Sequence, residues 1–114
     1  MENKEKINLT KQEVLDLFTE TGLKPQKLNM IDIVNGTVCG CLVGAMYVKE
    51  NKVNLEEVKN YDKNKLDCLS HEVWEWAKKF EKDDFWDSMG AFDCPNLTCF
   101  KKPEISEAAS ILFS

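Results

Sequence analysis

The longest uncharged stretch of the chain, residues 33–48, constrains its fold more than any other feature. A helix that crosses a bilayer needs about 20 consecutive apolar residues, so this shorter stretch predicts buried core instead. Asn35-Gly36 interrupts the stretch, and Asn-Gly is the strongest short-range signal for a β-hairpin, because both residues tolerate a positive φ. We therefore expect a short hairpin near residues 28–39.

Residues 41–48, which follow the hairpin, are compatible with either a buried strand or a buried helix, because apolar periodicity alone does not separate the two. Gly44 and Ala45 are small enough to let a helix pack closely against a neighbouring element. This feature favours a helix.

Capping signals delimit another helix near the N-terminus. Thr10 and Glu13 have the spacing of a capping box, in which each side chain accepts a hydrogen bond from the other residue's backbone amide. Gly22 supplies the left-handed residue that commonly ends a helix, and Pro25 prevents its continuation. The sequence therefore predicts a helix between Thr10 and Gly22.

Similar signals predict four further helices and the fold class. These helices are expected to begin near Asn54, Ser70, Asp83 or Asp84, and Pro103. The polar residues 61–65 predict a loop.

With only 5 Gly and 3 Pro among 114 residues, the composition excludes collagen-like and disordered chains. We expect one mainly helical α+β domain over residues 1–114, a short hairpin with four or five packed helices, and a frayed N-terminus over residues 1–8.

Three short motifs also resemble a known pattern. They are Gly22-Leu23-Lys24-Pro25, Cys41-Leu42-Val43-Gly44-Ala45, and Phe85 followed by Gly90-Ala91-Phe92-Asp93. They resemble small uncharacterised bacterial and phage proteins in which Gly-Leu-x-Pro precedes a hairpin and Cys-x-Leu-Gly-Ala opens an apolar helix. Val43 replaces the usual Leu, and Ala91 is inserted in the last motif. The resemblance implies an order of elements and transfers no activity and no site residue.

The charge of the chain excludes some partners and favours others. There are 15 basic and 20 acidic residues, which give a net charge of −5, and every basic residue is a lysine. Arginine supplies the bidentate fork for phosphate and guanine, so an acidic chain without arginine is not expected to bind nucleic acid directly. A protein with a basic surface is the better electrostatic match. The alternative is that the charge serves solubility alone.

Cysteine usage and the N-terminal residues point to a compartment. Residues 1–6 mix charges and lack the apolar stretch of a signal peptide. The chain has five cysteines, an odd number that does not indicate a set of paired disulfides. We therefore expect reduced thiols, a cytoplasmic location and no membrane association. A homo-oligomer is compatible with these features.

Residues 72–93 form the densest candidate site. They hold seven acidic residues, three lysines and all three tryptophans. An exposed tryptophan ringed by carboxylates would suit recognition of a basic partner. The predicted partner-binding residues are Glu72, Trp74, Glu75, Glu81, Asp83, Asp84, Trp86 and Asp87. We expect a non-enzymatic regulator or inhibitor, encoded by a bacterium, phage or mobile element, that mimics the charge of nucleic acid.

Two alternatives to this interpretation of residues 72–93 stay open. One is a solvated acidic helix that covers an aromatic core and has no partner. The other is a small-molecule pocket lined by the tryptophans.

The thiols and the single histidine raise a zinc hypothesis. The candidate ligands form three pairs: Cys39 with Cys41, Cys68 with His71, and Cys94 with Cys99. Tetrahedral zinc needs four such ligands, but no Cys-x-x-Cys knuckle is present and cysteine is among the most buried residue types. We therefore favour buried, inert thiols and no cofactor, with a structural zinc domain as the alternative.

A cysteine-dependent enzyme is the remaining alternative. His71 is the one imidazole that could act as a base, and Cys68 is its nearest thiol in the sequence. Cys41, at the start of a helix, would have a lowered pKa. These groups do not form a recognisable catalytic set, and we expect no enzymatic activity and no catalytic residue.

Overall fold

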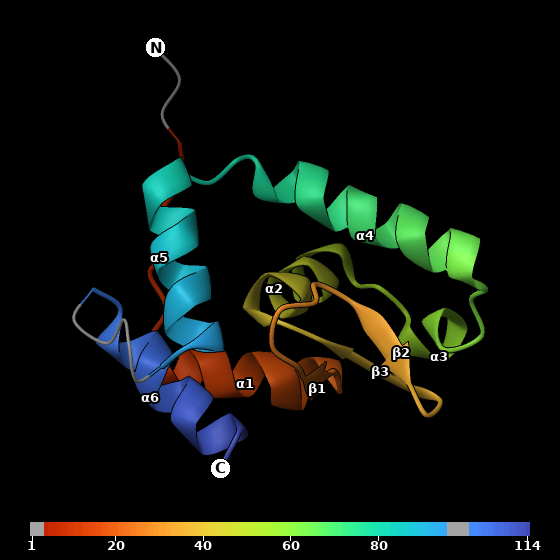
Figure 1. Cartoon of the computed structure of the whole chain (residues 1–114), viewed down its shortest axis with the longest axis horizontal. Helices are drawn as coiled ribbons and strands as arrows, with labels where there is room; N and C mark the ends of the chain where they lie inside the picture. The colour runs from red at the N-terminus through yellow and green to blue at the C-terminus, as the bar shows by residue number, and fades with distance from the viewer. Residues whose placement is uncertain (1–3, 96–100) are drawn as a thin grey trace.

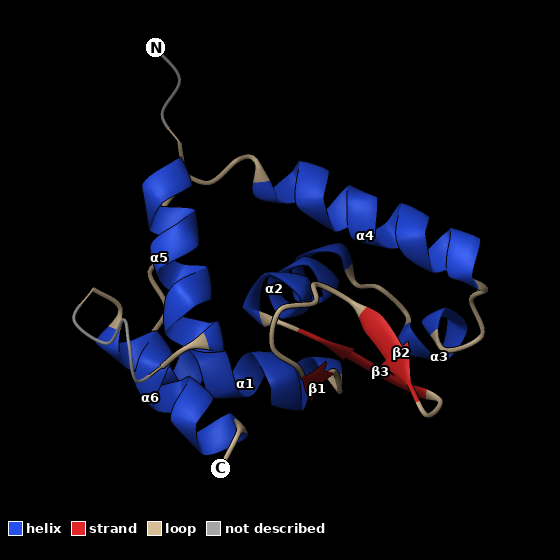
Figure 2. Ribbon diagram, in the orientation of Figure 1, coloured by secondary structure: helices blue, strands red, loops and turns tan. Residues whose placement is uncertain are grey.

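The fold is mainly helical α+β, as the sequence predicts, in a computed structural model that describes residues 4–95 and 101–114 (Figures 1 and 2). Within those ranges the chain forms six helices and a three-stranded sheet. In chain order they are α1 (Lys11–Thr21), β1 (Lys24–Pro25), β2 (Asp32–Val34), β3 (Thr37–Gly40), α2 (Leu42–Asn51), α3 (Leu55–Val58), α4 (Lys63–Ala77), α5 (Lys82–Asp93) and α6 (Pro103–Leu112). No helix in the described ranges has both the length and the apolarity to cross a membrane.

Helix α1 confirms the capping prediction at both ends. The Glu13 amide donates to Oγ1 of Thr10 at 3.1 Å, and the Thr10 amide donates to Oε1 of Glu13 at 2.9 Å. Gly22 has a φ of 75° and donates its N–H to the carbonyl of Phe18. Local side-chain chemistry therefore sets the limits of this helix.

The hairpin forms where Asn35-Gly36 predicts it, and a further strand joins it. Asn35 and Gly36 both have positive φ, as a type I′ turn requires, and Ile33 pairs with Val38 across the antiparallel strands β2 and β3. The first hairpin strand begins at Asp32, later than expected. Strand β1, which is too short to show a periodicity, lies parallel to β3 on its other side.

Helix α2 lies at the centre of the molecule, where it contacts α1, α4 and α5 (Figure 1). Met46 and Tyr47 are half-buried, but its other apolar residues are almost fully buried, which confirms the prediction of a buried helix. They include Leu42, Val43, Ala45 and Val48. Gly44 faces the backbone carbonyl of Met30, and a Cβ atom built at Gly44 would lie 1.7 Å from that oxygen. The close packing expected of Gly44 is therefore a contact with the loop before β2.

Helix α4 corrects two predictions. It begins at Lys63, so residues 63–65 of the predicted loop 61–65 are helical, and Ser70 lies within the helix instead of capping it. The actual N-cap is Asp62, whose carboxylate accepts from the Lys65 amide at 2.8 Å. The first two turns of α4 are mostly exposed and polar, and only Leu66 and Leu69 extend the apolar face from Val73 back toward the start of the helix.

The N-terminal segment is part of the fold in its described portion, contrary to the expectation of a frayed end over residues 1–8. The Glu5 amide donates to the carbonyl of Lys79 at 3.0 Å, and the Glu81 amide donates to the carbonyl of Glu5 at 2.7 Å. Ile7 is buried. This pairing with the connection between α4 and α5 is long-range, and the mixed charges of the segment gave no sign of it.

Candidate functional site

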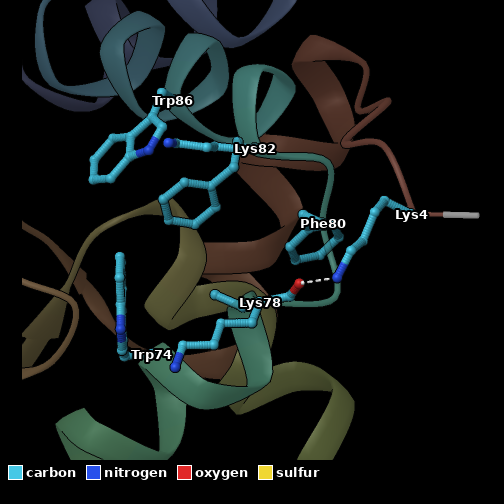
Figure 3. Close-up of a pocket in the computed structure, with 8 residues that line it drawn as sticks. Lys4, Trp74, Lys78, Phe80, Lys82 and Trp86 are labelled. Atoms are coloured by element: carbon cyan, nitrogen blue, oxygen red, sulfur yellow. Dashed lines mark hydrogen bonds between the residues drawn. The ribbon is translucent and has the colours of Figure 1, made fainter. Parts of the chain in front are cut away.

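The connection between α4 and α5 forms an elbow that brings two exposed tryptophans together. Trp74 lies in the last turn of α4, and Trp86 lies in the second turn of α5. Their ring centroids are 6.2 Å apart. The side chains are 38% and 53% exposed respectively, which is unusual for the largest apolar residue type. Figure 3 shows them projecting from the two helices into the same pocket.

The pocket beside the two indoles has a volume of about 450 Å³ and a mainly apolar lining. We call it the tryptophan cleft and define it by its lining residues: Lys4, Trp74, Ala77, Lys78, Phe80, Lys82, Phe85 and Trp86. The buried ring of Phe85 meets Trp74 edge-on at 6.0 Å and Trp86 edge-on at 5.0 Å. These edge-to-face contacts hold both indoles in place while their outer surfaces stay open to solvent.

Lysines line the cleft alongside the aromatic rings. None of the predicted carboxylates is among its lining residues. Lys78 follows Trp74 by four residues, and Lys82 precedes Trp86 by four, so each lysine lies one helical turn from a tryptophan along the chain. The amino group of Lys4 donates to the carbonyl of Lys78 at 3.3 Å and brings the N-terminal segment to the same edge (Figure 3). These lysines were not among the predicted site residues, although the four-residue spacing was a visible signal.

Three of the predicted carboxylates are engaged on the outer surface of the helices. Glu75 pairs with the amino group of Lys78 at 3.0 Å. Glu72 accepts from the hydroxyl of Tyr47 at 3.3 Å, and Asp87 lies 3.6 Å from the amino group of Lys101.

The other three predicted carboxylates lie in or next to the first turn of α5. Glu81 caps the helix by accepting from the amides of Asp83 and Asp84, and Asp83 is exposed. Asp84 is mostly buried, where it pairs with Lys102 at 2.6 Å and accepts from the Ile7 amide at 2.6 Å. Burial opposes ionisation, but these two hydrogen bonds, together with the positive charge of Lys102, outweigh it and lower the pKa of Asp84. The carboxylates of Glu81 and Asp84 therefore have structural roles within the fold.

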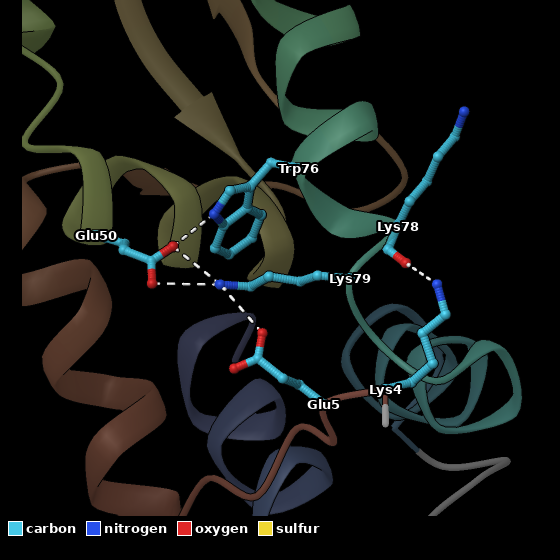
Figure 4. A network of polar contacts seen from close by, with 6 residues as sticks. All are labelled: Lys4, Glu5, Glu50, Trp76, Lys78 and Lys79. Carbon is cyan, nitrogen blue, oxygen red and sulfur yellow. Dashed lines mark hydrogen bonds and ion pairs between the residues drawn. The ribbon is translucent and has the colours of Figure 1, made fainter. Parts of the chain in front are cut away.

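The third tryptophan, Trp76, has a different environment. Its indole N–H donates to Glu50 of α2, and the amino group of Lys79 lies 4.3 Å above its ring. Lys79 also pairs with Glu50 at 3.1 Å and with Glu5 at 3.5 Å (Figure 4). This network ties α2, α4 and the N-terminal segment together, so Trp76 has a structural role and does not line the cleft.

The zinc candidates do not converge in the described part of the chain. Cys39 and Cys41 are buried, whereas Cys68 and Cys94 are exposed; Cys99 lies outside the described residues. Among residues 4–95 and 101–114, no group of three or more His, Cys, Asp and Glu side chains is placed to hold a metal ion. His71 lies 3.5 Å from Glu75 on the surface of α4.

Cys41 is the N-cap of α2, as expected, but its pKa moves in the opposite direction from the prediction. Burial raises the pKa of this thiol to about 11 and outweighs the opposing effect of the backbone amides of Gly44 and Val43. Burial also raises the pKa of Cys39, and the nearby Asp32 adds to the shift. Both thiols are therefore protonated at neutral pH and poor nucleophiles.

Native alkylation measures this reactivity. We expect Cys41 to react with iodoacetamide at pH 7 on the order of 10²-fold more slowly than an ordinary thiol, because its thiolate fraction falls tenfold with each unit of pKa. Mass spectrometry of the digested protein would follow each cysteine, and exposed Cys68 provides an internal control. Labelling of Cys41 as fast as Cys68 in the folded protein would contradict this assignment.

Comparison with known proteins finds no matching family model, no matching curated protein and no matching solved structure. The resemblance to small bacterial and phage proteins therefore stays a prediction. The geometry of the cleft is what supports a function.

Proposed function

We propose that this protein acts without catalysis, by binding another protein through the tryptophan cleft as a regulator or inhibitor. The observation that supports the proposal is the pair of exposed indoles beside an apolar pocket of about 450 Å³. Tryptophan is enriched among the residues that contribute most to binding energy at protein interfaces. Exposed aromatic side chains gathered beside an apolar groove are a feature of protein-interaction and ligand-binding sites.

The packing under the cleft favours binding for a second reason. Phe85 contacts both indoles, so Trp74 and Trp86 are already ordered before a partner arrives. A partner then loses less affinity to side-chain ordering, which otherwise costs about 0.5–1.5 kcal/mol for each immobilised side chain. The cleft is therefore preorganised for an apolar side chain of the partner.

The net charge adds a long-range component to this proposal. A charge of −5 attracts a protein with a basic surface and repels nucleic acid, so we keep the basic partner, the cytoplasmic location and the absence of direct nucleic-acid binding as parts of the proposal. The cleft adds a local contact, at which the side chains of the partner meet the indoles.

Selection from a random peptide library tests the proposal even though the partner is unidentified. We expect peptides selected on the wild-type protein to lose at least about tenfold in affinity for Trp86→Ala, because Trp86 is exposed and its removal takes away contact area from one wall of the cleft. The matched control is Ile111→Ala, which removes a similarly exposed apolar side chain from α6. Isothermal titration calorimetry would measure both affinities, after circular dichroism has confirmed that both variants are folded.

The contradicting result is equally specific. If the selected peptides bind Trp86→Ala and Trp74→Ala as tightly as the wild-type protein, the cleft is not the binding surface and the proposal fails.

A further inference from the structure

The tryptophan cleft carries a local charge opposite to that of the chain as a whole. Lys4, Lys78 and Lys82 line it, and none of its lining residues is acidic, although the chain has a net charge of −5. The amino group of Lys78 forms an ion pair with Glu75, whereas Lys82 has no ion-pair partner among the described residues. The structure therefore places positive charge where a partner would touch the aromatic rings.

The indole N–H groups of the cleft add unused hydrogen-bond donors. Trp76 donates its N–H to Glu50, but within residues 4–95 and 101–114 the N–H groups of Trp74 and Trp86 have no protein acceptor. Indole N–H groups and lysine ammonium groups only donate, so the polar side chains that line the cleft are donors and none is an acceptor. A ligand group that only accepts, such as a carboxylate, is the chemical complement of this arrangement.

We infer that the partner segment that occupies the cleft is an apolar side chain flanked by acidic residues. This inference rests on the proposed function and names the chemistry of the ligand. The apolar side chain would cover Phe80, Phe85 and the two indoles, and the flanking carboxylates would face Lys78 and Lys82. A basic flank would meet like charge at the same positions, which disfavours binding. The partner surface would then be basic overall, as the net charge of this chain favours, and acidic at the docking segment.

Single-stranded nucleic acid is the competing polyanion, because its bases stack on exposed aromatic rings. The net negative charge and the absence of arginine oppose its approach, since phosphate contacts dominate such binding. A short peptide with a few carboxylates meets much less of this repulsion. The acidic apolar peptide is therefore the favoured ligand, and an oligonucleotide provides the comparison.

Three synthetic peptides with the same Leu-Phe centre test the inference. One has two Asp on each side, one has two Lys and one has two Ser. By fluorescence anisotropy of the labelled peptides at low salt, we expect the acidic peptide to bind at least about tenfold more tightly than the basic one, with the neutral one between them. The difference should shrink as salt shortens the range of the interaction. A labelled oligothymidylate should bind more weakly than the acidic peptide.

Two charge-reversal variants test the contribution of a cleft lysine to peptide binding. Lys82→Glu should weaken binding of the acidic peptide about fivefold or more and should strengthen binding of the basic peptide. Lys63→Glu is the matched control, since it makes the same change of charge on an exposed residue in the first turn of α4, outside the cleft. It should leave both affinities nearly unchanged.

The outcomes separate this inference from the proposed function. The inference is overturned if the acidic peptide binds no more tightly than the other two, if oligothymidylate binds more tightly, or if Lys63→Glu acts as strongly as Lys82→Glu. In each of these cases the proposed protein binding through the cleft still stands when library-selected peptides lose affinity for Trp86→Ala, although tighter binding of oligothymidylate would also contradict the proposed absence of direct nucleic-acid binding. The proposed function fails when these peptides bind Trp86→Ala and Trp74→Ala as tightly as the wild-type protein.

Discussion

Gly44→Ala should destabilise the protein by more than about 4 kcal/mol, a large share of the total stability of a domain of this size. The added Cβ would lie 1.7 Å from the carbonyl oxygen and 2.9 Å from the carbonyl carbon of Met30. Alanine is the better helix former by about 1 kcal/mol, so propensity alone predicts the opposite sign. The clash decides the outcome because both contacting atoms belong to the backbone and cannot rotate away.

The surrounding contacts explain why neither element yields easily. The Cys41 amide donates to the carbonyl of Asn29 at 2.8 Å and so fixes the loop next to Met30. Helix α2 is held from the other sides by α1, α4 and α5. Denaturant unfolding followed by circular dichroism would measure the loss.

Two controls sharpen this experiment. Ala45→Gly, at the adjacent buried position, should cost only about 1–2 kcal/mol through helix propensity and a lost methyl group. Met30→Ala should not rescue Gly44→Ala, since it leaves the Met30 carbonyl in place. Stability of Gly44→Ala within about 1 kcal/mol of the wild type would show that α2 does not pack against this loop.

Asp84→Asn should lower the free energy of unfolding by about 3 kcal/mol, because it leaves the mostly buried ammonium of Lys102 without its counter-charge. The side chains of Asp84 and Lys102 are 12% and 15% exposed, and their charged atoms are 2.6 Å apart. Asp84 also accepts from the Ile7 amide, so this one carboxylate joins α5 to the N-terminal segment and to the start of α6. Asp83→Asn, one residue earlier and exposed, is the matched control and should cost less than about 1 kcal/mol.

The pH dependence of stability follows from the direction of the Asp84 pKa shift. The pKa of Asp84 is lower in the folded protein than its ordinary value of 3.8. Its contribution is therefore fully present above that value and is lost as the pH falls through the lower folded pKa. The stability of Asp84→Asn should therefore lack the loss that titration of Asp84 causes at acid pH, whereas the stability of Asp83→Asn should still show it. Equal stability and equal acid profiles for the two variants would contradict the assigned role of Asp84.

The elements that the sequence predicted correctly have signals contained in a few neighbouring residues. The capping box of Thr10 and Glu13 and the Asn35-Gly36 turn act within one helical turn or one hairpin. Strand β1 was missed because its position depends on a partner distant in the sequence. The start of α4 was missed although its N-cap, Asp62, is a local signal. Strand β1 exists through its pairing with β3, and in the mostly polar first two turns of α4 only Leu66 and Leu69 extend the apolar face of the helix.

Part of the candidate site could also be predicted, because some of its signals lie in neighbouring residues of the sequence. Trp74 and Trp86 were identified from the cluster of aromatic residues, and both line the cleft. The lysines of the cleft were missed because the acidic residues outnumber them in the sequence, whereas the elbow between α4 and α5 decides which side chains share the pocket. Lys4 joins them from the other end of the chain through a hydrogen bond to Lys78.

The most direct test of the proposed binding surface is a two-dimensional ¹H–¹⁵N NMR titration with a peptide selected on the wild-type protein. The three indole N–H groups report separately, and Trp76 is an internal control because its N–H is bonded to Glu50. The tryptophan cleft predicts large shifts for the indole signals of Trp74 and Trp86 and little change for Trp76. Unchanged signals for Trp74 and Trp86 at saturating peptide would show that binding takes place elsewhere on the molecule.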